Sequence, residues 1–220
     1  MTAAGRLASG GTGDSDTATA PAASGGHALD ALDLERARLF ALLGRLLAAA
    51  PDEGLLAGLA GLSGEPGTDL GAAYDALAAA ARATDPVAAL HEFEDLFLGV
   101  GRGEVLPYGS YYLTGFLNDR PLARLRGDLA GIGVARAEGA SEPEDHLGFV
   151  CETYAGLIAG AFPDAPGDAA ARFFGTHLAP WAVRCFTDIE RAGSARFYRA
   201  VAALGRAAVE TERAAMELPA

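Results

Sequence analysis

Apolar residues recur every three to four positions along most of the chain, and no stretch alternates between apolar and polar with a period of two. Leucine and alanine are abundant and β-branched residues are few, which favours helices throughout. Proline and glycine interrupt the periodic pattern. It predicts helices over residues 29–49, 52–59, 70–83, 85–98, 121–130, 141–160, 169–178, 180–192 and 195–216. We therefore predict an all-α protein, a compact bundle of roughly ten helices.

The chain divides into a tail and one helical domain. Residues 1–28 consist largely of Gly, Ala, Ser, Thr and Asp, which predicts a disordered low-complexity tail. Residues 29–217 carry the helical pattern, and a Gly-rich connection over 131–141 predicts a hinge between two closely packed subdomains. A monomer is the default expectation, although such a hinge would permit a domain-swapped dimer.

The charge balance narrows the range of partners. The 220 residues carry 29 acidic and 17 basic side chains, a net charge of -12, and every basic residue is an arginine. Phosphate backbones need a basic face, so nucleic acid is excluded as a partner, whereas a basic peptide would be attracted. There is no apolar core of signal-peptide length and no run of about 20 apolar residues, so we expect a cytoplasmic protein without stable membrane insertion.

An acidic segment followed by a histidine precedes one of the predicted helices. Ser141 and Glu144 have the S-x-x-E spacing of a capping box, and Pro143 would occupy the first helical turn. This interpretation makes Asp145 and His146 an exposed acid–imidazole pair at a helix start. The capping box does not explain His146, because a cationic ring is disfavoured at a helix N-terminus.

A second notable stretch is aromatic. Phe93, Leu96 and Phe97 share one helix face, which indicates either core packing or an apolar contact surface. Tyr108 and Tyr111 follow in a cluster of three tyrosines, which is typical of a surface that is part core and part contact.

The patterns of common catalytic and metal sites are missing from the sequence. The four histidines form neither Glu-x-x-His nor H-E-x-x-H, and no nucleophile–base constellation is evident. Adjacent helical residues point about 100° apart, so Asp145 would not orient the ring of His146 for catalysis. Cys151 and Cys185 are expected to be buried free thiols. We predict no enzymatic activity, no metal and no cofactor.

Three motifs together resemble the TorD/DmsD family of redox-enzyme maturation proteins. They are Phe93-x-x-Leu96-Phe97-x-Gly99, the Pro-Tyr-x-Ser stretch at 107–110, and Glu142-Pro143-x-Asp145-His146. The resemblance extends over residues 29–216. One departure is Phe93, where many members carry Trp or Tyr, and the long tail is an addition.

The resemblance implies a cytoplasmic, all-α chaperone. Such a protein binds the apo catalytic subunit of a molybdopterin oxidoreductase and its twin-arginine signal peptide, assists cofactor insertion and delays export. A formate dehydrogenase is the expected client, with a dimethyl sulfoxide or trimethylamine-N-oxide reductase as the competitor. Two alternatives stay open: a nucleotide- or small-molecule-binding regulatory module of the same fold, and an enzyme with His146 as general base.

The resemblance also implies a cargo site. Asp145 would be the charge partner of an arginine, and His146 would bond the cargo backbone or clamp the hinge. A groove of Phe93, Leu96, Phe97 and Tyr108 would accept the apolar part of the peptide. The implied cargo-binding residues are Phe93, Leu96, Phe97, Pro107, Tyr108, Tyr111, Glu142, Pro143, Asp145 and His146.

Overall fold

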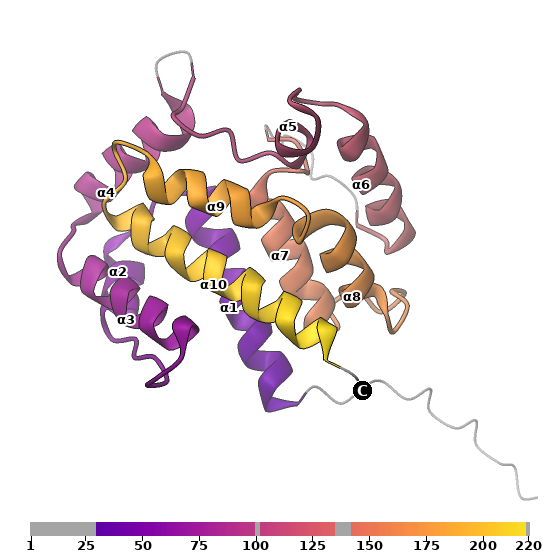
Figure 1. Cartoon of the computed structure of the whole chain (residues 1–220), viewed down its shortest axis with the longest axis horizontal. Coiled ribbons are helices and arrows are strands. Elements are labelled where there is room, and N and C mark those ends of the chain that lie inside the picture. The colour runs from indigo at the N-terminus through magenta and orange to yellow at the C-terminus, as the bar shows by residue number, and fades with distance from the viewer. Residues whose placement is uncertain (1–29, 100–101, 135–141, 219–220) are drawn as a thin grey trace, which may run out of the picture.

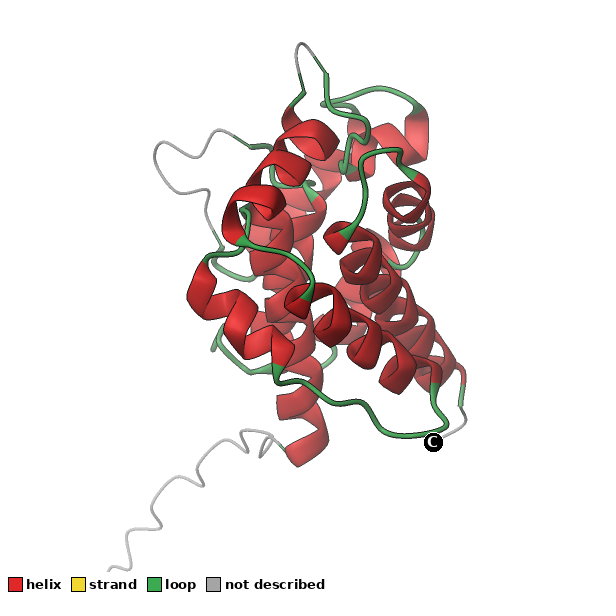
Figure 2. Ribbon diagram, turned by 90° about the vertical axis from the view of Figure 1, so that its left-hand side faces the viewer, coloured by secondary structure: helices red, strands yellow, loops and turns green. Residues whose placement is uncertain are grey.

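The computed structural model describes residues 30–99, 102–134 and 142–218. Within these ranges ten α-helices and two five-residue π-helical segments form, and there is no strand, which confirms the all-α prediction (Figures 1 and 2). The elements are α1 (Ala31–Ala48), α2 (Glu53–Ala60), α3 (Asp69–Arg82), α4 (Pro86–Phe93), η1 (Glu94–Leu98), α5 (Gly109–Thr114), α6 (Arg120–Gly131), α7 (Leu147–Ile158), α8 (Ala169–Phe173), η2 (Phe174–Leu178), α9 (Ala182–Arg191) and α10 (Phe197–Glu217). The predicted tail, and residues 135–141 of the predicted hinge, lie outside the described residues.

The centre of the molecule is the crossing of α1 and α7. A Cβ atom added to Gly44 would lie only 3.0 Å from the carbonyl oxygen of Gly148, so the two backbones meet without intervening side chains. Beside this crossing the rings of Phe40 and Tyr154 pack edge to face with centroids 4.8 Å apart. The crossing sets the position of the first residues of α7, which directly follow the acid–histidine motif of the resemblance.

The longest helix, α10, joins the two sides of the fold, packing on α9 and on α3 (Figure 1). Its start is held by Glu92 of α4, a buried carboxylate that accepts hydrogen bonds from the backbone N–H groups of Arg196, Phe197 and Tyr198 at 2.7, 3.0 and 2.7 Å. A side chain distant in sequence therefore caps α10, and no residue next to the helix does so.

Several helix starts follow local sequence signals. Asp85 accepts from the N–H groups of Val87 and Ala88, both at 2.9 Å, and Pro86 occupies the first turn, as the Asp-Pro pair predicts. Asp52 and Thr68 cap α2 and α3 in the same way.

The predicted start of the helix over 141–160 is wrong. The helix begins at Leu147, and Pro143 and Glu144 precede it in a turn; Ser141 lies outside the described residues. The Glu144 carboxylate accepts from Nε and Nη2 of Arg126 of α6 at 3.0 and 2.8 Å, a tertiary ion pair that the local sequence pattern does not contain.

Two predicted helices end in π-helical turns, and the structure contains one helix that the sequence pattern did not predict. The helix over 85–98 ends as α-helix at Phe93 and continues as η1, and the helix over 169–178 continues as η2 from Phe174. The short α5 falls in the tyrosine cluster, where no helix is expected from the pattern. No helix in the described ranges has the length and apolar character needed to cross a membrane.

Candidate functional site

Two of the three motifs meet through their backbones. Tyr108 and His146 form an isolated antiparallel β-bridge. The N–H of Gly109 donates to the carbonyl of Asp145 at 2.8 Å, and the N–H of Leu147 donates to the carbonyl of Pro107 at 2.7 Å. The stretch before α5 and the stretch before α7 are thereby fastened together as one unit, which we call the bridge site (residues 107–110 and 142–147).

Asp145 is buried, contrary to the expectation of an exposed acid. Only 3% of the residue is exposed, and its Oδ2 accepts from the backbone N–H of Ser110 at 2.7 Å. Its Oδ1 has no hydrogen-bond partner, and the same holds for the buried Oγ of Ser110. Buried polar atoms are nearly always partnered, so two unpartnered atoms on residues that contact each other mark a place where a ligand can supply donors and acceptors.

His146 is also buried, and its place at the helix start now has a reason. The residue is the N-cap of α7, and its Nδ1 accepts from the N–H of Gly148 at 3.1 Å. That bond requires a neutral ring. Burial lowers the pKa of His146, against the opposing influence of Glu142 and Asp145, so the neutral form is favoured. Only a cationic ring is disfavoured at a helix start, and the neutral ring of His146 can cap it.

Tyr108 and Glu142 form the outer side of the bridge site. The Tyr108 hydroxyl donates to the carboxylate of Glu142, which is exposed, and the Tyr108 ring packs edge-on against His146 with centroids 5.3 Å apart. Burial and the bond to Glu142 raise the pKa of Tyr108, so the hydroxyl stays a donor. Pro143 is half-buried, and its carbonyl accepts from the N–H of His146 at 3.1 Å.

A cavity of about 380 Å³ adjoins the inner side of the bridge site. Asp145, Gly109 and Trp181 contribute to its wall. A Cβ atom on Gly109 would lie 3.1 Å from the Trp181 ring, so a side chain at this position would press on the ring. Two arginines of α6, Arg120 and Arg124, line the same cavity.

A neighbouring cavity of about 320 Å³ shares Arg124 and His177 with the first and adds Arg172. His177 lies on η2 and its Nε2 is 2.7 Å from a carboxylate oxygen of Asp128. Burial lowers the pKa of His177, and Asp128 opposes this. Within the described ranges, no three His, Cys, Asp or Glu side chains converge where they could hold a metal ion.

The aromatic stripe lies elsewhere and is mostly core. Leu96 has no exposed surface, and Phe93 and Phe97 pack on Tyr198 of α10 with ring centroids 5.9 and 5.4 Å away. Tyr108 packs on His146.

Tyr111 lies on α5. Its ring is 5.6 Å from the guanidinium of Arg102, whose Nη2 also donates to the Tyr111 hydroxyl at 3.2 Å. The structure thus brings together six of the ten implied residues, namely Pro107, Tyr108, Glu142, Pro143, Asp145 and His146.

The residues that sequence reasoning missed are those contributed by other helices. Ser110 appears in the motif of the resemblance without a role, and Arg120, Arg124 and Trp181 carry no local signal of a cavity. Gly109 could have been found, since a glycine beside aromatic residues often marks a close backbone approach.

This chain is similar in sequence to one protein family and to named chaperones. A family model described as nitrate reductase delta subunit matches residues 64–187, a range that contains every implied site residue. The chaperone protein TorD of Vibrio cholerae serotype O1 (strain ATCC 39315) is 32% identical over 134 residues, which cover 56% of this chain and 59% of the relative. TorD of Aliivibrio fischeri is 35% identical over 69 residues, covering 30% of this chain and 32% of the relative. The chain therefore matches less than two thirds of the length of these relatives.

Proposed function

This chain belongs to the TorD/DmsD family of chaperones, and from that membership we propose that it is a maturation chaperone for a molybdopterin oxidoreductase. It binds the apo catalytic subunit and the twin-arginine signal peptide of that subunit. Binding assists cofactor insertion and delays export, and it takes place in the cytoplasm.

The observation that carries the proposal is the buried, half-satisfied carboxylate of Asp145. Its Oδ1 and the Oγ of Ser110 have no hydrogen-bond partner. A guanidinium of the signal peptide would donate to Oδ1 in a charge-assisted hydrogen bond. The net charge of -12 attracts a basic peptide over longer range.

Glu142 supplies a second carboxylate for the arginines of the signal peptide. Arg120 and Arg124 line the inner cavity and would repel a guanidinium arriving from that side. Glu142 is exposed on the outer side of the bridge site, where the Tyr108 hydroxyl holds its carboxylate. The signal peptide therefore approaches along Tyr108 and Glu142 and reaches Asp145 last.

His146 has a positioning role in this proposal. Its Nδ1 is engaged with the N–H of Gly148, and its backbone is paired with Tyr108 in the bridge. The ring thus fixes the peptide stretch that carries Asp145 and Glu142. An engaged, buried imidazole is a poor general base, so we propose no catalytic step.

Substitution of Asp145 tests the cation site. Asp145→Asn preserves the shape and the bond to Ser110 but removes the charge, so affinity for a labelled twin-arginine signal peptide should fall roughly tenfold or more. Fluorescence anisotropy measures this, with peptides from formate dehydrogenase, dimethyl sulfoxide reductase and trimethylamine-N-oxide reductase subunits as probes. Asp164→Asn makes the same charge change at an exposed loop position and should bind normally. Equal affinity for both variants would contradict the proposal.

A nucleotide- or small-molecule-binding role of the same fold remains the second candidate, and the inner cavities favour it. Arg120, Arg124 and Arg172 line two adjoining cavities in an otherwise acidic chain, which suits an anion. A thermal-shift titration with guanosine and adenosine triphosphates distinguishes this role. A rise in melting temperature that disappears in Arg124→Gln would support this role. An unchanged melting temperature at millimolar nucleotide would exclude it.

A further inference from the structure

The cavity of about 380 Å³ beside the bridge site carries positive charge where it meets solvent. Arg120 and Arg124 of α6 both line the cavity, and both residues are exposed. They are four positions apart in one helix, so their side chains project from the same face. Two guanidinium groups on one face of a helix form a local basic site in a chain whose net charge is -12.

These two arginines are not held by ion pairs within the fold. The third arginine of α6, Arg126, binds the carboxylate of Glu144 at 2.8 Å, whereas neither Arg120 nor Arg124 forms an ion pair with another residue that the structure describes. Arg120 is also the first residue of its helix, where the helix dipole disfavours a cation. Both guanidinium groups can therefore bind an external carboxylate, the group that an arginine fork fits best.

Much of the remaining cavity lining is apolar. Leu113, Pro121, Leu125, Val150 and Trp181 contribute apolar surface to it. Leu113 is 40% exposed, so part of this surface faces solvent. A cavity of this size, with an apolar interior and a few polar groups, suits a bulky apolar side chain.

Asp145 determines how a ligand is oriented in the cavity. Its buried carboxylate forms part of the wall and disfavours a second carboxylate in the interior. Arg120 and Arg124 favour a carboxylate on the α6 side. A ligand that meets both conditions has an apolar side chain inside the cavity and a carboxylate outside, which is the chemistry of an acidic segment with bulky apolar residues.

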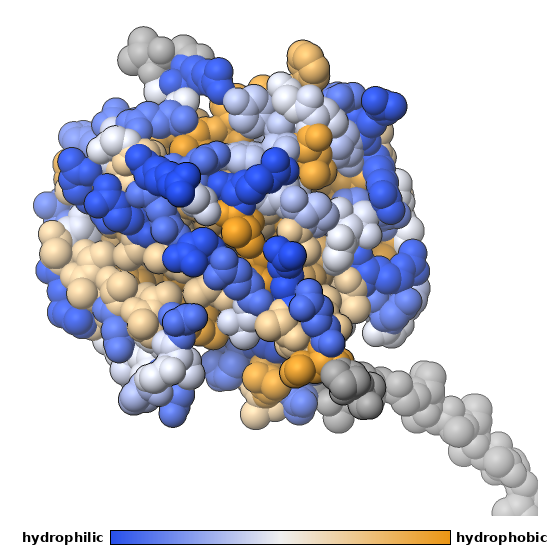
Figure 3. Space-filling view, viewed as in Figure 1, coloured by the Kyte–Doolittle hydropathy of each residue, from blue (hydrophilic) through white to orange (hydrophobic). Residues whose placement is uncertain are grey.

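The turn between α5 and α6 adds exposed apolar surface. It connects Thr114 to Arg120, both of which line the cavity. On this turn Phe116 is 72% exposed and Leu117 is 45% exposed. In Figure 3 hydrophobic surface protrudes above α5, and hydrophilic surface follows α6. Exposed apolar side chains beside arginines are typical of a contact surface for another protein.

We propose that the α5–α6 corner (residues 113–125) binds an acidic segment with bulky apolar residues, in the part of the apo catalytic subunit outside its signal peptide. An apolar side chain of the segment enters the cavity, and a neighbouring carboxylate pairs with Arg120 and Arg124. This inference rests on the proposed function. The basic signal peptide does not compete for these arginines. Because Gly109 and Asp145 belong to both the bridge site and the cavity wall, one subunit can occupy both sites at once.

Removal of the two positive charges tests the carboxylate contact. The probe is a set of overlapping labelled peptides that covers the mature sequence of the subunit whose signal peptide binds the chain. We expect the parent to select peptides with net negative charge and bulky apolar residues. The double variant Arg120→Gln, Arg124→Gln should bind the best of them roughly tenfold more weakly. Added salt should weaken binding by the parent more than binding by the variant, because only the parent makes the ion pairs.

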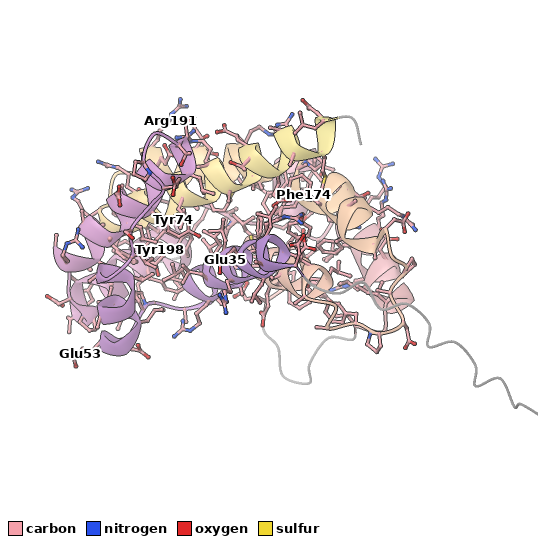
Figure 4. All side chains as sticks on the ribbon, turned by 90° about the horizontal axis from the view of Figure 1, so that it is seen from below. Glu35, Glu53, Tyr74, Phe174, Arg191 and Tyr198 are labelled. Atoms are coloured by element: carbon pink, nitrogen blue, oxygen red, sulfur yellow. The ribbon has the colours of Figure 1, made fainter. Side chains whose placement is uncertain are left out.

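A matched control removes two other exposed arginines. The double variant Arg191→Gln, Arg213→Gln makes the same charge change outside the cavity lining and should bind within about twofold of the parent. In Figure 4 Arg191, the last residue of α9, lies apart from Phe174 of η2, the element that contributes His177 to the cavity. Circular dichroism melting checks that both double variants are folded.

The apolar contact is tested separately. Leu113→Gln removes exposed apolar surface from the cavity lining and should weaken binding of the same acidic peptide roughly fivefold. Leu90→Gln makes the same change on α4, where the leucine is 44% exposed and does not line the cavity, and should leave the affinity within about twofold of the parent.

The outcomes separate this inference from the proposed function. Equal affinities of the two double variants for the acidic peptide, or selection of basic peptides by the parent, would overturn the α5–α6 assignment while signal-peptide binding stands. No signal-peptide binding by the parent would overturn both. Sedimentation with phosphatidylglycerol vesicles that is lost in Arg120→Gln, Arg124→Gln, without binding of any acidic peptide, would assign the corner to a membrane surface and overturn the inference.

Discussion

His146 stabilises the start of α7 only while its ring is neutral, since Nδ1 must accept from the N–H of Gly148. Burial lowers its folded-state pKa below the ordinary value of about 6.5. The unfolded state therefore takes up the proton at higher pH than the folded state. The contribution to stability is complete above about pH 6.5 and is lost as the pH falls through the folded-state pKa.

His146→Asn should reduce this acid sensitivity. Asparagine offers an N-cap oxygen for the same N–H but does not titrate. The free energy of unfolding of the parent, measured in urea at pH 7 and pH 5, should fall more than that of the variant. The pKa of His177 is lowered in the same direction, so a residual dependence should remain. Parallel losses in parent and variant would show that the ring does not titrate as described.

Cys151 and Cys185 are buried free thiols, as expected from their place on apolar helix faces. Burial raises the pKa of both, so the reactive thiolate is disfavoured. Neither thiol should react with a disulfide reagent within minutes in the folded protein, and both should react in guanidinium chloride. The absorbance of the released thiolate measures this, and rapid reaction of either cysteine in the folded state would contradict the burial.

At the scale of elements, the structure depends on contacts that bring together distant parts of the chain. Glu92 caps α10, and Arg126 binds Glu144. The backbone of α1 at Gly44 lies against the backbone of α7 at Gly148. Each of these contacts joins residues that lie far apart in the sequence.

The cap on α10 can be tested directly. Glu92→Gln keeps an oxygen acceptor but loses the charge that three backbone N–H groups share. We expect the free energy of unfolding to fall by about 2 kcal/mol. Urea denaturation followed by circular dichroism provides the value. Glu94→Gln, an exposed neighbour, should change it by less than about 0.5 kcal/mol, and equal effects would argue against a special role of Glu92.

Local signals explain which elements the sequence predicts well. Asp85 with Pro86 marks a helix start by side-chain capping, and the apolar period identifies long helices such as α1 and α10. The six-residue α5 is too short for a period, and the π-helical turns η1 and η2 carry no distinctive composition. The sequence pattern places the start of α7 too early, because the N-cap is His146, whose neutral ring accepts from the N–H of Gly148.

The site residues likewise divide into those that the sequence identifies and those whose environment depends on tertiary contacts. The resemblance placed Asp145 and His146 in one motif, and the structure brings that motif to Tyr108. Sequence alone suggested that both residues are exposed, because charge usually indicates a surface position. Their burial follows from the bridge to residues 107–110 and from the helix start, which depend on the folded arrangement.

At the scale of the whole molecule, the account joins an acidic net charge and a bridge site with an unpartnered buried carboxylate. A basic peptide matches these features in charge. The central claim is that the chain holds one molybdoenzyme subunit before export.

The most direct test is to purify the tagged chain from its native cells and identify the bound proteins by mass spectrometry, with Asp145→Asn as the matched control. The account predicts a single large molybdopterin oxidoreductase subunit with its twin-arginine signal peptide still attached, at much lower yield with Asp145→Asn. Recovery of that subunit without a signal peptide would contradict the export role. Recovery of no such subunit from cells that express one would contradict the account as a whole.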